Sequence, residues 1–112
     1  MPRRISWVKA ALRAFQEFPL EAQLRMTRAL EIAAAGEKAD SAKPMKGLGA
    51  GVFEIALPYR GGAFRAVYAV QLGPDLWVLH AFQKKSTQGI KTPQREIEVI
   101  RERLKRIKEM ER

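Results

Sequence analysis

Three apolar segments follow one another in the second half of the chain, and short turns separate them. Pro58 to Gly62 lie between the first two, with a Gly61–Gly62 pair that suits positive φ, and Gly73–Pro74–Asp75 lie between the second and third. Connections this short join antiparallel neighbours, because a parallel pair needs a longer crossover. The sequence therefore predicts three consecutive antiparallel strands: Val52 to Leu57, Phe64 to Leu72 and Leu76 to Phe82.

The residues before these strands have helical spacing. A first helix is predicted from about Trp7 to Glu17, and it ends before Pro19. A second helix follows and ends near Gly36, with an apolar face that consists of Ala22, Met26, Ala29, Leu30 and Ala33. Ile5 to Val8 also fit a short edge strand, and both interpretations remain open for that segment.

The residues after the strands predict one more helix, from about Pro93 to Met110. Thr92 is expected as its N-cap and Pro93 at its first position, and an apolar stripe follows: Ile97, Ile100, Leu104 and Ile107. The glycine-containing stretch Glu37 to Gly51 is predicted as a loop. We therefore expect a single α+β domain over residues 1–112, with two N-terminal helices on a small antiparallel sheet of three to four strands and a C-terminal helix.

Basic side chains outnumber acidic ones. Lys and Arg number 21 and Asp and Glu number 12, which gives a net charge of +9. The stretch from Leu76 to Arg95 contains four Lys or Arg and His80 but no carboxylate. Uncompensated positive charge on a strand and loop fits a polyanionic partner better than a helix whose acids and bases alternate. We expect nucleic acid, the ribosome or an acidic protein segment as the partner.

The composition also excludes several classes of protein. The chain has no cysteine and one histidine, which excludes disulfide scaffolds, zinc ribbons, thiol nucleophiles and a histidine-based metal site. No metal and no cofactor are expected. The apolar stretches fall short of the roughly 20 residues that a membrane span needs, and no apolar signal core follows Arg3 and Arg4. We expect a soluble, cytoplasmic protein without a membrane partner.

Acids in the sheet region are too few for paired-carboxylate chemistry. Glu54 and Asp75 are the only ones, which disfavours glycosidase, aspartic-protease and two-metal nuclease mechanisms. RNA can still be cleaved, because its own 2′-hydroxyl can attack the adjacent phosphorus. Arg or Lys can stabilise the phosphorane, and a histidine or a lysine of lowered pKa can move the proton. The strands provide Arg65, His80, Lys84 and Lys85 for these tasks, and Tyr68 to stack on a base.

Each of these residues also has a structural interpretation. Arg65 either pairs with Glu54 on the neighbouring strand or contacts a ligand, and the pair would not exclude the contact. A lone His80 between apolar neighbours is more often a satisfied core residue than a catalyst. Lys84 and Lys85 fit either a solvated strand end or a phosphate contact.

Several segments occur in an order typical of one toxin family. They are KPMK at Lys43 to Lys46, GLGAGVFEI ending at Ile55, FRAVY at Phe64 to Tyr68, VLHAFQKKS at Val78 to Ser86 and TPQREIEVIRERL at Thr92 to Leu104. In these segments the chain resembles the phage-derived, HigB-like branch of the RelE/ParE toxin superfamily. The resemblance covers roughly the last two thirds of the chain, and the N-terminal helices match only in kind.

The resemblance implies a microbial RNase-type fold and a toxin of a type II toxin-antitoxin system. Such toxins cleave messenger RNA without a metal, commonly in the ribosomal A site, and thereby inhibit translation. The resemblance also implies a cognate antitoxin from the same operon, typically a helix-turn-helix, HigA-like protein. Operator DNA would then be bound only indirectly, through that antitoxin.

The resemblance also assigns roles to residues by position. Arg65 matches the strand arginine that acts on the scissile phosphate, His80 the histidine of this branch, and Lys84 and Lys85 the basic residues after the last strand. These four are the expected catalytic residues. The chain departs from the family at Glu54 and Ala56, where relatives carry basic residues, and a late tyrosine has no clear counterpart. The residues expected to bind RNA are Lys46, Arg60, Tyr68, Lys91 and Arg95.

Two other functions remain open at this point. One is a ParE-like toxin that inhibits gyrase by binding protein rather than by catalysis. The small number of catalytic residues favours it, and the LHAFQKKS segment disfavours it. The other is a phage-related nucleic-acid-binding module that does not cleave, for which RNA binding would weaken steeply with salt.

Overall fold

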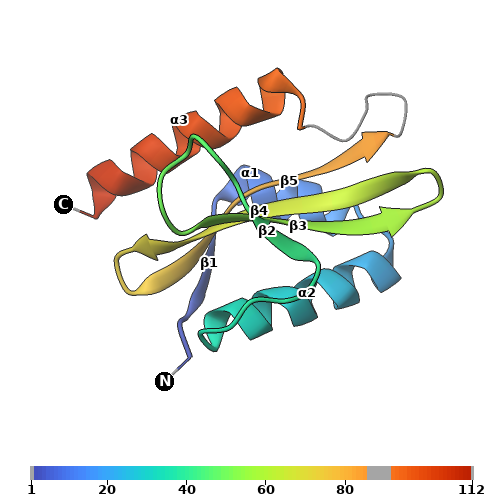
Figure 1. Ribbon diagram of the computed structural model, residues 1–112, viewed down its shortest axis with the longest axis horizontal. Helices are drawn as coiled ribbons and strands as arrows, with labels where there is room; N and C mark the ends of the chain where they lie inside the picture. The colour runs from blue at the N-terminus through green and yellow to red at the C-terminus, as the bar shows by residue number, and fades with distance from the viewer. Residues whose placement is uncertain (1, 86–91, 112) are drawn as a thin grey trace.

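The computed structural model describes residues 2–85 and 92–111, and its centre is a mixed sheet with helices on both faces (Figure 1). The two longest strands are β4 and β5, which form a hairpin in the middle of the sheet. The elements in chain order are β1 Ile5–Trp7, α1 Lys9–Gln16, α2 Leu20–Ala34, β2 Ala42–Pro44, β3 Val52–Tyr59, β4 Gly62–Leu72, β5 Asp75–Lys85 and α3 Gln94–Met110.

The sheet has five strands in the order β1-β5-β4-β3-β2, and the predicted three to four strands are therefore too few. The three predicted strands are its centre, and the α+β class is confirmed. β1 confirms the edge-strand interpretation of its segment, so α1 begins at Lys9 rather than near Trp7. β1 runs parallel to β5, while the other pairs are antiparallel. β2 lies within the stretch predicted as a loop, where three residues pair with β3.

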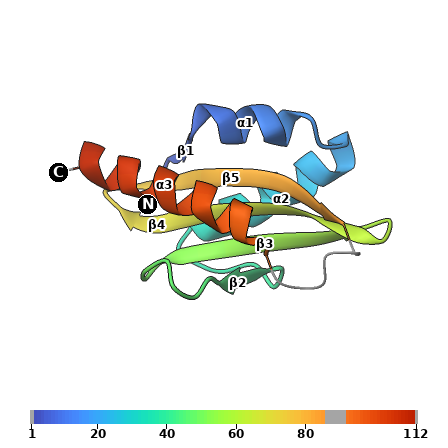
Figure 2. The ribbon, with the colours of Figure 1, turned by 90° about the horizontal axis from the view of Figure 1, so that it is seen from above.

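Two layers of helix cover the two faces of the sheet (Figure 2). α1 and α2 pack on one face, where Phe15, Met26 and Leu30 meet Ile55 and other strand residues in one buried cluster. α3 packs on the opposite face over a second cluster, which consists of Leu48, Val52, Val67, Ala69, Leu72, Leu79, Phe82, Ile100, Leu104 and Ile107. Both faces of the central strands are therefore buried, which explains their nearly continuous apolar sequence.

The β3–β4 turn differs from the prediction. Tyr59 pairs with Gly62, so the loop consists of Arg60 and Gly61, and both have positive φ (44° and 79°). Two residues of positive φ are typical of a type I′ turn, which suits the twist of a two-residue hairpin. Gly62 has no positive φ, contrary to expectation; a Cβ there would instead meet the backbone carbonyl of Lys84.

The start of α3 also differs from the prediction. Pro93 occupies the N-cap position and no side chain caps the helix. The predicted N-cap role of Thr92 is therefore wrong, because its hydroxyl donates instead to Glu54 Oε2 on β3 at 2.8 Å. This bond links the beginning of α3 to the sheet, and it directs attention to the surface around Glu54.

Candidate functional site

A hollow of about 770 Å³ lies between the β2 side of the sheet and the beginning of α3. We call it the Arg65 pocket. Its wall combines charged, polar and apolar side chains from four parts of the chain: Asp40, Ser41, Lys43, Pro44, Met45, Lys46, Glu54, Ala56, Arg65, Thr92 and Ile97. Two of the residues expected from the sequence, Arg65 and Lys46, line this pocket.

Strand pairing places the charged residues of the site on one face. Arg65 lies across from Ala56 on β3 and from Phe82 on β5, and Lys84 lies across from Ala63. Residues two apart on a strand share a face, so Arg65 and Lys84 lie diagonally on the face that α3 covers. Glu54 belongs to the same face, because its partner Val67 is part of the cluster beneath α3.

Arg65 and Glu54 form a largely buried ion pair. Arg65 Nη1 donates to Glu54 Oε1 at 2.5 Å, and the two side chains are 14% and 12% exposed. The other carboxylate oxygen of Glu54 accepts the hydrogen bond from Thr92. Arg65 Nε is buried without a hydrogen-bond partner among the described residues. Of the two interpretations that the sequence left open for Arg65, the pair with Glu54 is therefore present, and the buried Nε donor has no partner among the described residues.

Lys84 is not a solvated strand end, because only 3% of the residue is exposed. Burial lowers the pKa of its ammonium group, and the positive charge of Arg65 lowers that pKa further, while the negative charge of Glu54 opposes both. A lysine in this setting gives up its proton more easily than a solvated one. Lys85, one residue further along β5, points to the other side of the strand and is exposed.

His80 connects β5 to α3. Arg103 Nη1 lies 3.1 Å from His80 Nδ1, and His80 Nε2 lies 2.8 Å from Glu96 Oε1. A guanidinium can only donate, so Nδ1 accepts and the proton of the neutral ring is on Nε2, which donates to Glu96. Burial is the largest cause that lowers the pKa of His80, and the charge of Arg103 acts in the same direction. In this structure His80 is a neutral residue with both nitrogens bonded.

The expected RNA-binding residues lie in different places. Lys46 is exposed at the Arg65 pocket, and Arg60 is exposed at the hairpin tip, 5.4 Å above the Tyr59 ring. Arg95 is 75% exposed in the first turn of α3, 3.8 Å from a carboxylate oxygen of Glu96. Lys91 lies outside the described residues.

Tyr68 does not agree with its expected role as a base-stacking residue. Only 1% of it is exposed, and it belongs to the cluster beneath α1 and α2, where it stacks on Phe53 with ring centroids 5.4 Å apart. Burial raises the pKa of its hydroxyl to about 12. It is three residues from Arg65 on the same strand, so the two side chains point to opposite faces. Tyr68 is a core residue.

The structure adds residues that the sequence pattern did not assign to a site. Glu54 was expected only as a partner of Arg65, but it also binds Thr92 and faces the pocket. Lys43 lies across from Glu54 on β2 and lines the same pocket. Glu96 and Arg103 hold His80; their spacing of seven residues on one helix was the available signal.

Two negative findings apply to the described part of the chain. No group of three or more His, Cys, Asp or Glu in residues 2–85 and 92–111 is placed to hold a metal ion. Within those ranges, none of the helices has the length and apolar character that a membrane crossing requires.

The fold is similar to that of a known toxin. A structure of a double mutant of the E. coli toxin RelE in the free state superposes with a TM-score of 0.64, covering 96% of this chain and 99% of that one at 18% sequence identity. The architecture is therefore RelE-like, as the sequence motifs predict.

The family model described as phage-derived protein Gp49-like (DUF891) matches residues 13–105, most of the chain. The chain belongs to this Gp49-like family. No curated protein matches it in sequence. Family and fold together confirm the predicted relationship to the phage-derived branch of the RelE/ParE superfamily.

Proposed function

We propose that the protein is the toxin of a type II toxin-antitoxin system and that it cleaves messenger RNA by attack of the 2′-hydroxyl on the adjacent phosphorus. The observation that carries the proposal is the Arg65 pocket, where a largely buried arginine meets a carboxylate. Buried Lys84 lies outside the lining of this pocket, on the same face of the sheet and near enough for the charge of Arg65 to lower its pKa. A pocket of about 770 Å³ can accommodate a nucleotide. The family and the RelE-like fold support the same class of function.

The residues in and beside the pocket have separate tasks in the proposed reaction. The substrate 2′-oxygen bonds to phosphorus, the 5′-oxygen of the next nucleotide leaves, and a cyclic phosphate remains. Arg65 and Lys84 would stabilise the negative charge of the phosphorane. Exposed Lys85 would add positive charge from a greater distance. Glu54 is placed to accept the 2′-hydroxyl proton, because a phosphate that binds Arg65 frees a carboxylate oxygen. Lys84 is the second group suited to proton transfer, and its ammonium would give the departing 5′-oxygen the proton that it needs.

His80 has a different part in this proposal. Proton transfer by its ring requires that its bond to Arg103 or to Glu96 open first. In the closed arrangement, His80 fixes α3 against β5 and thereby keeps Thr92 beside Glu54. We therefore assign proton transfer to Glu54 and Lys84 before His80.

The partners follow from the proposed class. Messenger RNA and the ribosome would be the targets, and the net charge of +9 suits both. A cognate antitoxin, of the helix-turn-helix, HigA-like kind, would hold the toxin inactive and would be its link to operator DNA.

The test is induced expression in cells, followed by mapping of the 5′ ends of messenger RNA. We expect growth arrest and new ends within translated regions, and we expect Arg65→Ala to reduce cleavage by about 100- to 1,000-fold because it removes the phosphorane's main donor. Arg28→Ala, an exposed arginine on α2, is the matched control and should remain toxic.

Circular dichroism of purified Arg65→Ala should show native secondary structure, with a lower free energy of unfolding because Glu54 loses its buried partner. A fully toxic Arg65→Ala protein with the same cleavage pattern would contradict the proposal. Growth arrest without new 5′ ends, together with inhibited gyrase supercoiling in vitro, would indicate a ParE-like toxin instead.

A further inference from the structure

The solvent side of α3 separates its charges into two sides. One side, next to the segment Lys46 to Gly49, carries three basic residues, Arg101, Lys105 and Lys108, and one acidic residue at its end, Glu109. We call these three residues the basic stripe. The adjacent side holds Glu98 and Glu102, which pair with Arg101 and Arg106. The stripe follows the i, i+4, i+7 spacing that keeps side chains on one helix face, and it spans about 10 Å.

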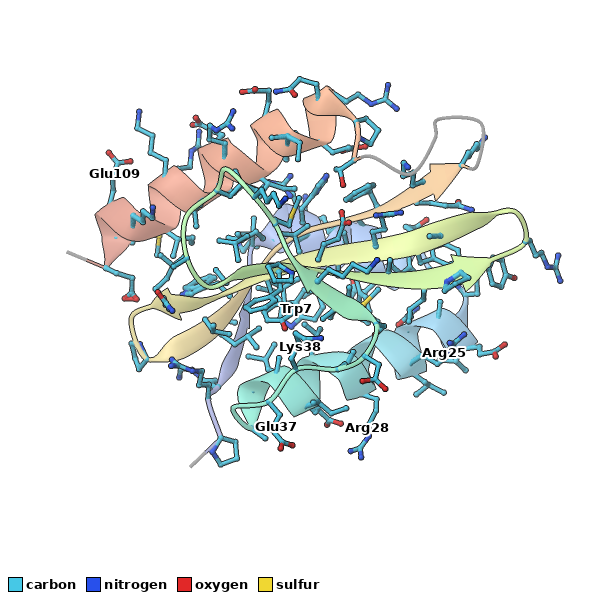
Figure 3. All side chains as sticks on the ribbon, viewed as in Figure 1. Trp7, Arg25, Arg28, Glu37, Lys38 and Glu109 are labelled. Carbon is cyan, nitrogen blue, oxygen red and sulfur yellow. The ribbon has the colours of Figure 1, made fainter. Side chains whose placement is uncertain are left out.

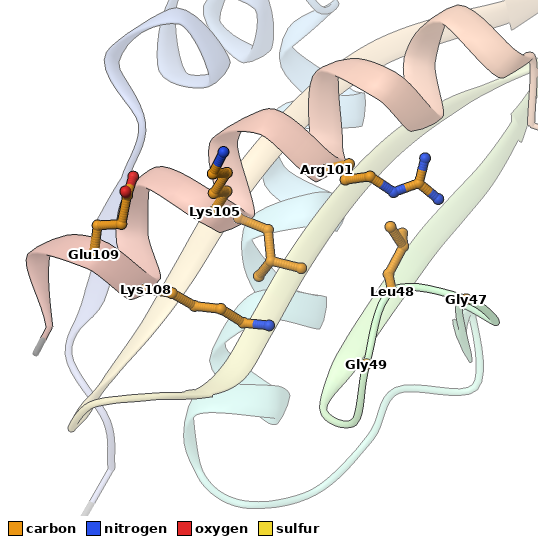
Figure 4. Close-up of a pocket in the computed structure, with 8 residues that line it drawn as sticks. Gly47, Leu48, Gly49, Arg101, Lys105, Lys108 and Glu109 are labelled. Atoms are coloured by element: carbon orange, nitrogen blue, oxygen red, sulfur yellow. The ribbon is translucent and has the colours of Figure 1, made fainter.

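The basic stripe borders a second hollow of about 390 Å³ whose other wall is glycine-rich (Figure 4). Leu48 fills the space beneath and is buried against Leu104, whereas Gly47 and Gly49 leave the backbone bare on both sides of it. A Cβ at Gly47 would meet no atom within 4 Å, and one at Gly49 would reach only the Lys108 ammonium, at 4.0 Å. In Figure 4, Arg101 and Lys108 extend toward this loop on either side of Leu48, whereas Lys105 and Glu109 point away from it.

The charges of the stripe are available to a ligand. Neither Lys105 nor Lys108 forms an ion pair within the described ranges of the chain. Arg101 pairs with Glu98 at 3.1 Å, but both side chains are more than half exposed, and such surface pairs contribute little. A phosphate group can therefore displace Glu98 from Arg101 with little loss of free energy.

The same glycine-containing loop also borders the Arg65 pocket. Lys46 and Met45 line that pocket, and Gly47, the next residue, lines the hollow beside the stripe. Positive charge therefore continues from Lys43 and Lys46 across the bare loop backbone to the basic stripe. A chain of phosphates that leaves the Arg65 pocket on this side passes Lys46 and the bare loop backbone before it meets Arg101 and Lys108, and the carboxylate of Glu109 lies beyond them toward the C-terminal end of α3.

We propose that the basic stripe and the loop at Gly47 to Gly49 bind the phosphate backbone of RNA that extends beyond the nucleotides in the Arg65 pocket. The proposal rests on the proposed function, because it requires RNA in that pocket. It assigns the stripe to affinity for long RNA and not to the cleavage step itself. Contacts to phosphate and sugar position a nucleic acid without reading its sequence, so the stripe should act on all sequences alike.

The experiment measures binding of two RNAs by fluorescence anisotropy over a range of NaCl concentrations. Both are 2′-O-methylated, so that they cannot be cleaved: a trinucleotide that fills only the pocket and a 12-nucleotide strand that reaches the stripe. The variant is Lys105→Gln with Lys108→Gln. The matched control is Arg25→Gln with Arg28→Gln, two exposed arginines on α2, across the molecule from α3 (Figure 3). Both double variants lower the net charge by two, so they differ only in where the charge is lost.

We expect the stripe variant to bind the 12-nucleotide RNA about tenfold more weakly at low salt. The slope of log Kd against log salt concentration should be smaller by about 1.4 for this variant. Each phosphate contact to a single strand contributes about 0.7 to that slope, and the variant loses two contacts. Its affinity for the trinucleotide should stay the same, and the α2 control should bind both RNAs almost as the unmodified protein does.

Two outcomes would overturn the inference. One is a stripe variant that binds the 12-nucleotide RNA like the control. Another is an equal loss for both RNAs, which would mean that the substitutions act on the pocket or the fold. An Arg65→Ala protein that still cleaves would overturn the proposed function instead, while leaving the comparison between stripe and control intact.

Discussion

Glu54 accepts hydrogen bonds from two groups of the site, and each of them would be destabilising if it were buried without a partner. The Arg65 guanidinium and the Thr92 hydroxyl both donate to its carboxylate, which is 12% exposed. A buried charge without a partner costs several kcal/mol, so the free protein needs an anion at this point. We infer that the carboxylate takes the place that a phosphate occupies when RNA binds. Under the proposed function, this would explain why the site carries an acidic residue.

Glu54→Gln separates binding from cleavage. The amide oxygen can still accept a hydrogen bond from Arg65, but the variant cannot accept a proton from the 2′-hydroxyl. We expect cleavage in a translating extract to fall by about 10²- to 10⁴-fold. Binding of 2′-O-methylated RNA should be equal or tighter, because a negative charge beside the phosphate is removed.

The control for this prediction is Glu98→Gln, which removes an exposed carboxylate from α3. It should leave cleavage unchanged. Undiminished cleavage by Glu54→Gln would show that another group, with Lys84 the first candidate, accepts the proton.

β5 and α3 are joined by a polar contact within an otherwise apolar interface. His80 stands between Arg103 and Glu96 of α3 and stacks on Phe82 of its own strand, with ring centroids 4.9 Å apart. Arg103 also donates to the Leu79 carbonyl at 2.9 Å. A proton added to Nδ1 would face the guanidinium of Arg103, so the interface accepts only the neutral ring.

This contact predicts how stability depends on pH. The pKa of His80 in the folded protein lies below its usual value near 6.5, mainly because the ring is buried. The unfolded chain therefore takes up a proton first as the pH falls below about 6.5, and the free energy of unfolding decreases from there down to the folded-state pKa. Above pH 6.5 the contribution of His80 is complete.

Urea unfolding between pH 5 and 8 measures this effect, and His80→Gln is the control. Glutamine can still bond to α3 but does not titrate, so this variant should lose the slope that the unmodified protein has below about pH 6.5. An unmodified protein with the same slope as His80→Gln would rule out a buried neutral His80. Asp75 does not interfere, because its pKa is lowered, chiefly by the Ser6 hydrogen bond, from a value already near 3.8.

The molecule as a whole has two apolar clusters that share one sheet. Phe64, Ala66 and Tyr68 of β4 belong to the cluster beneath α1 and α2, while Val67 and Ala69 of the same strand belong to the cluster beneath α3. Neither cluster can lose its strands without exposing the other. We therefore expect the two sides of the sheet to unfold together in one cooperative transition.

The two tryptophans test this expectation, because Trp7 packs against the first cluster and Trp77 against the second. Trp7→Phe and Trp77→Phe each leave a single fluorescent reporter, one on each side of the sheet. For each variant, the urea midpoint from fluorescence should coincide with the midpoint from far-ultraviolet circular dichroism. A tryptophan signal that changes at lower urea than the circular dichroism would mean that its side of the sheet unfolds separately.

The local sequence determined the central elements of this fold. Short glycine turns and continuous apolar runs predicted β3, β4 and β5, and helical spacing predicted α2 and α3 to within a few residues. It also indicated the Arg65–Glu54 pair as one of two interpretations, the other being a ligand contact, because buried charged residues on neighbouring strands need partners. These features depend on interactions between residues close in sequence or joined by one tight turn.

The tertiary structure decided which side chains meet in the site. Between the pairs Val67–His80 and Tyr68–Val78, Leu79 is an additional residue on β5, so a β-bulge interrupts the alternation. Without it, His80 and Lys84 would point to the same face as Val78, away from Arg65. Because the side-chain period of a strand is two, one extra residue moves every later side chain to the opposite face. The sequence does not mark this residue, so the approach of Lys84 to Arg65 became visible only once the strands were paired.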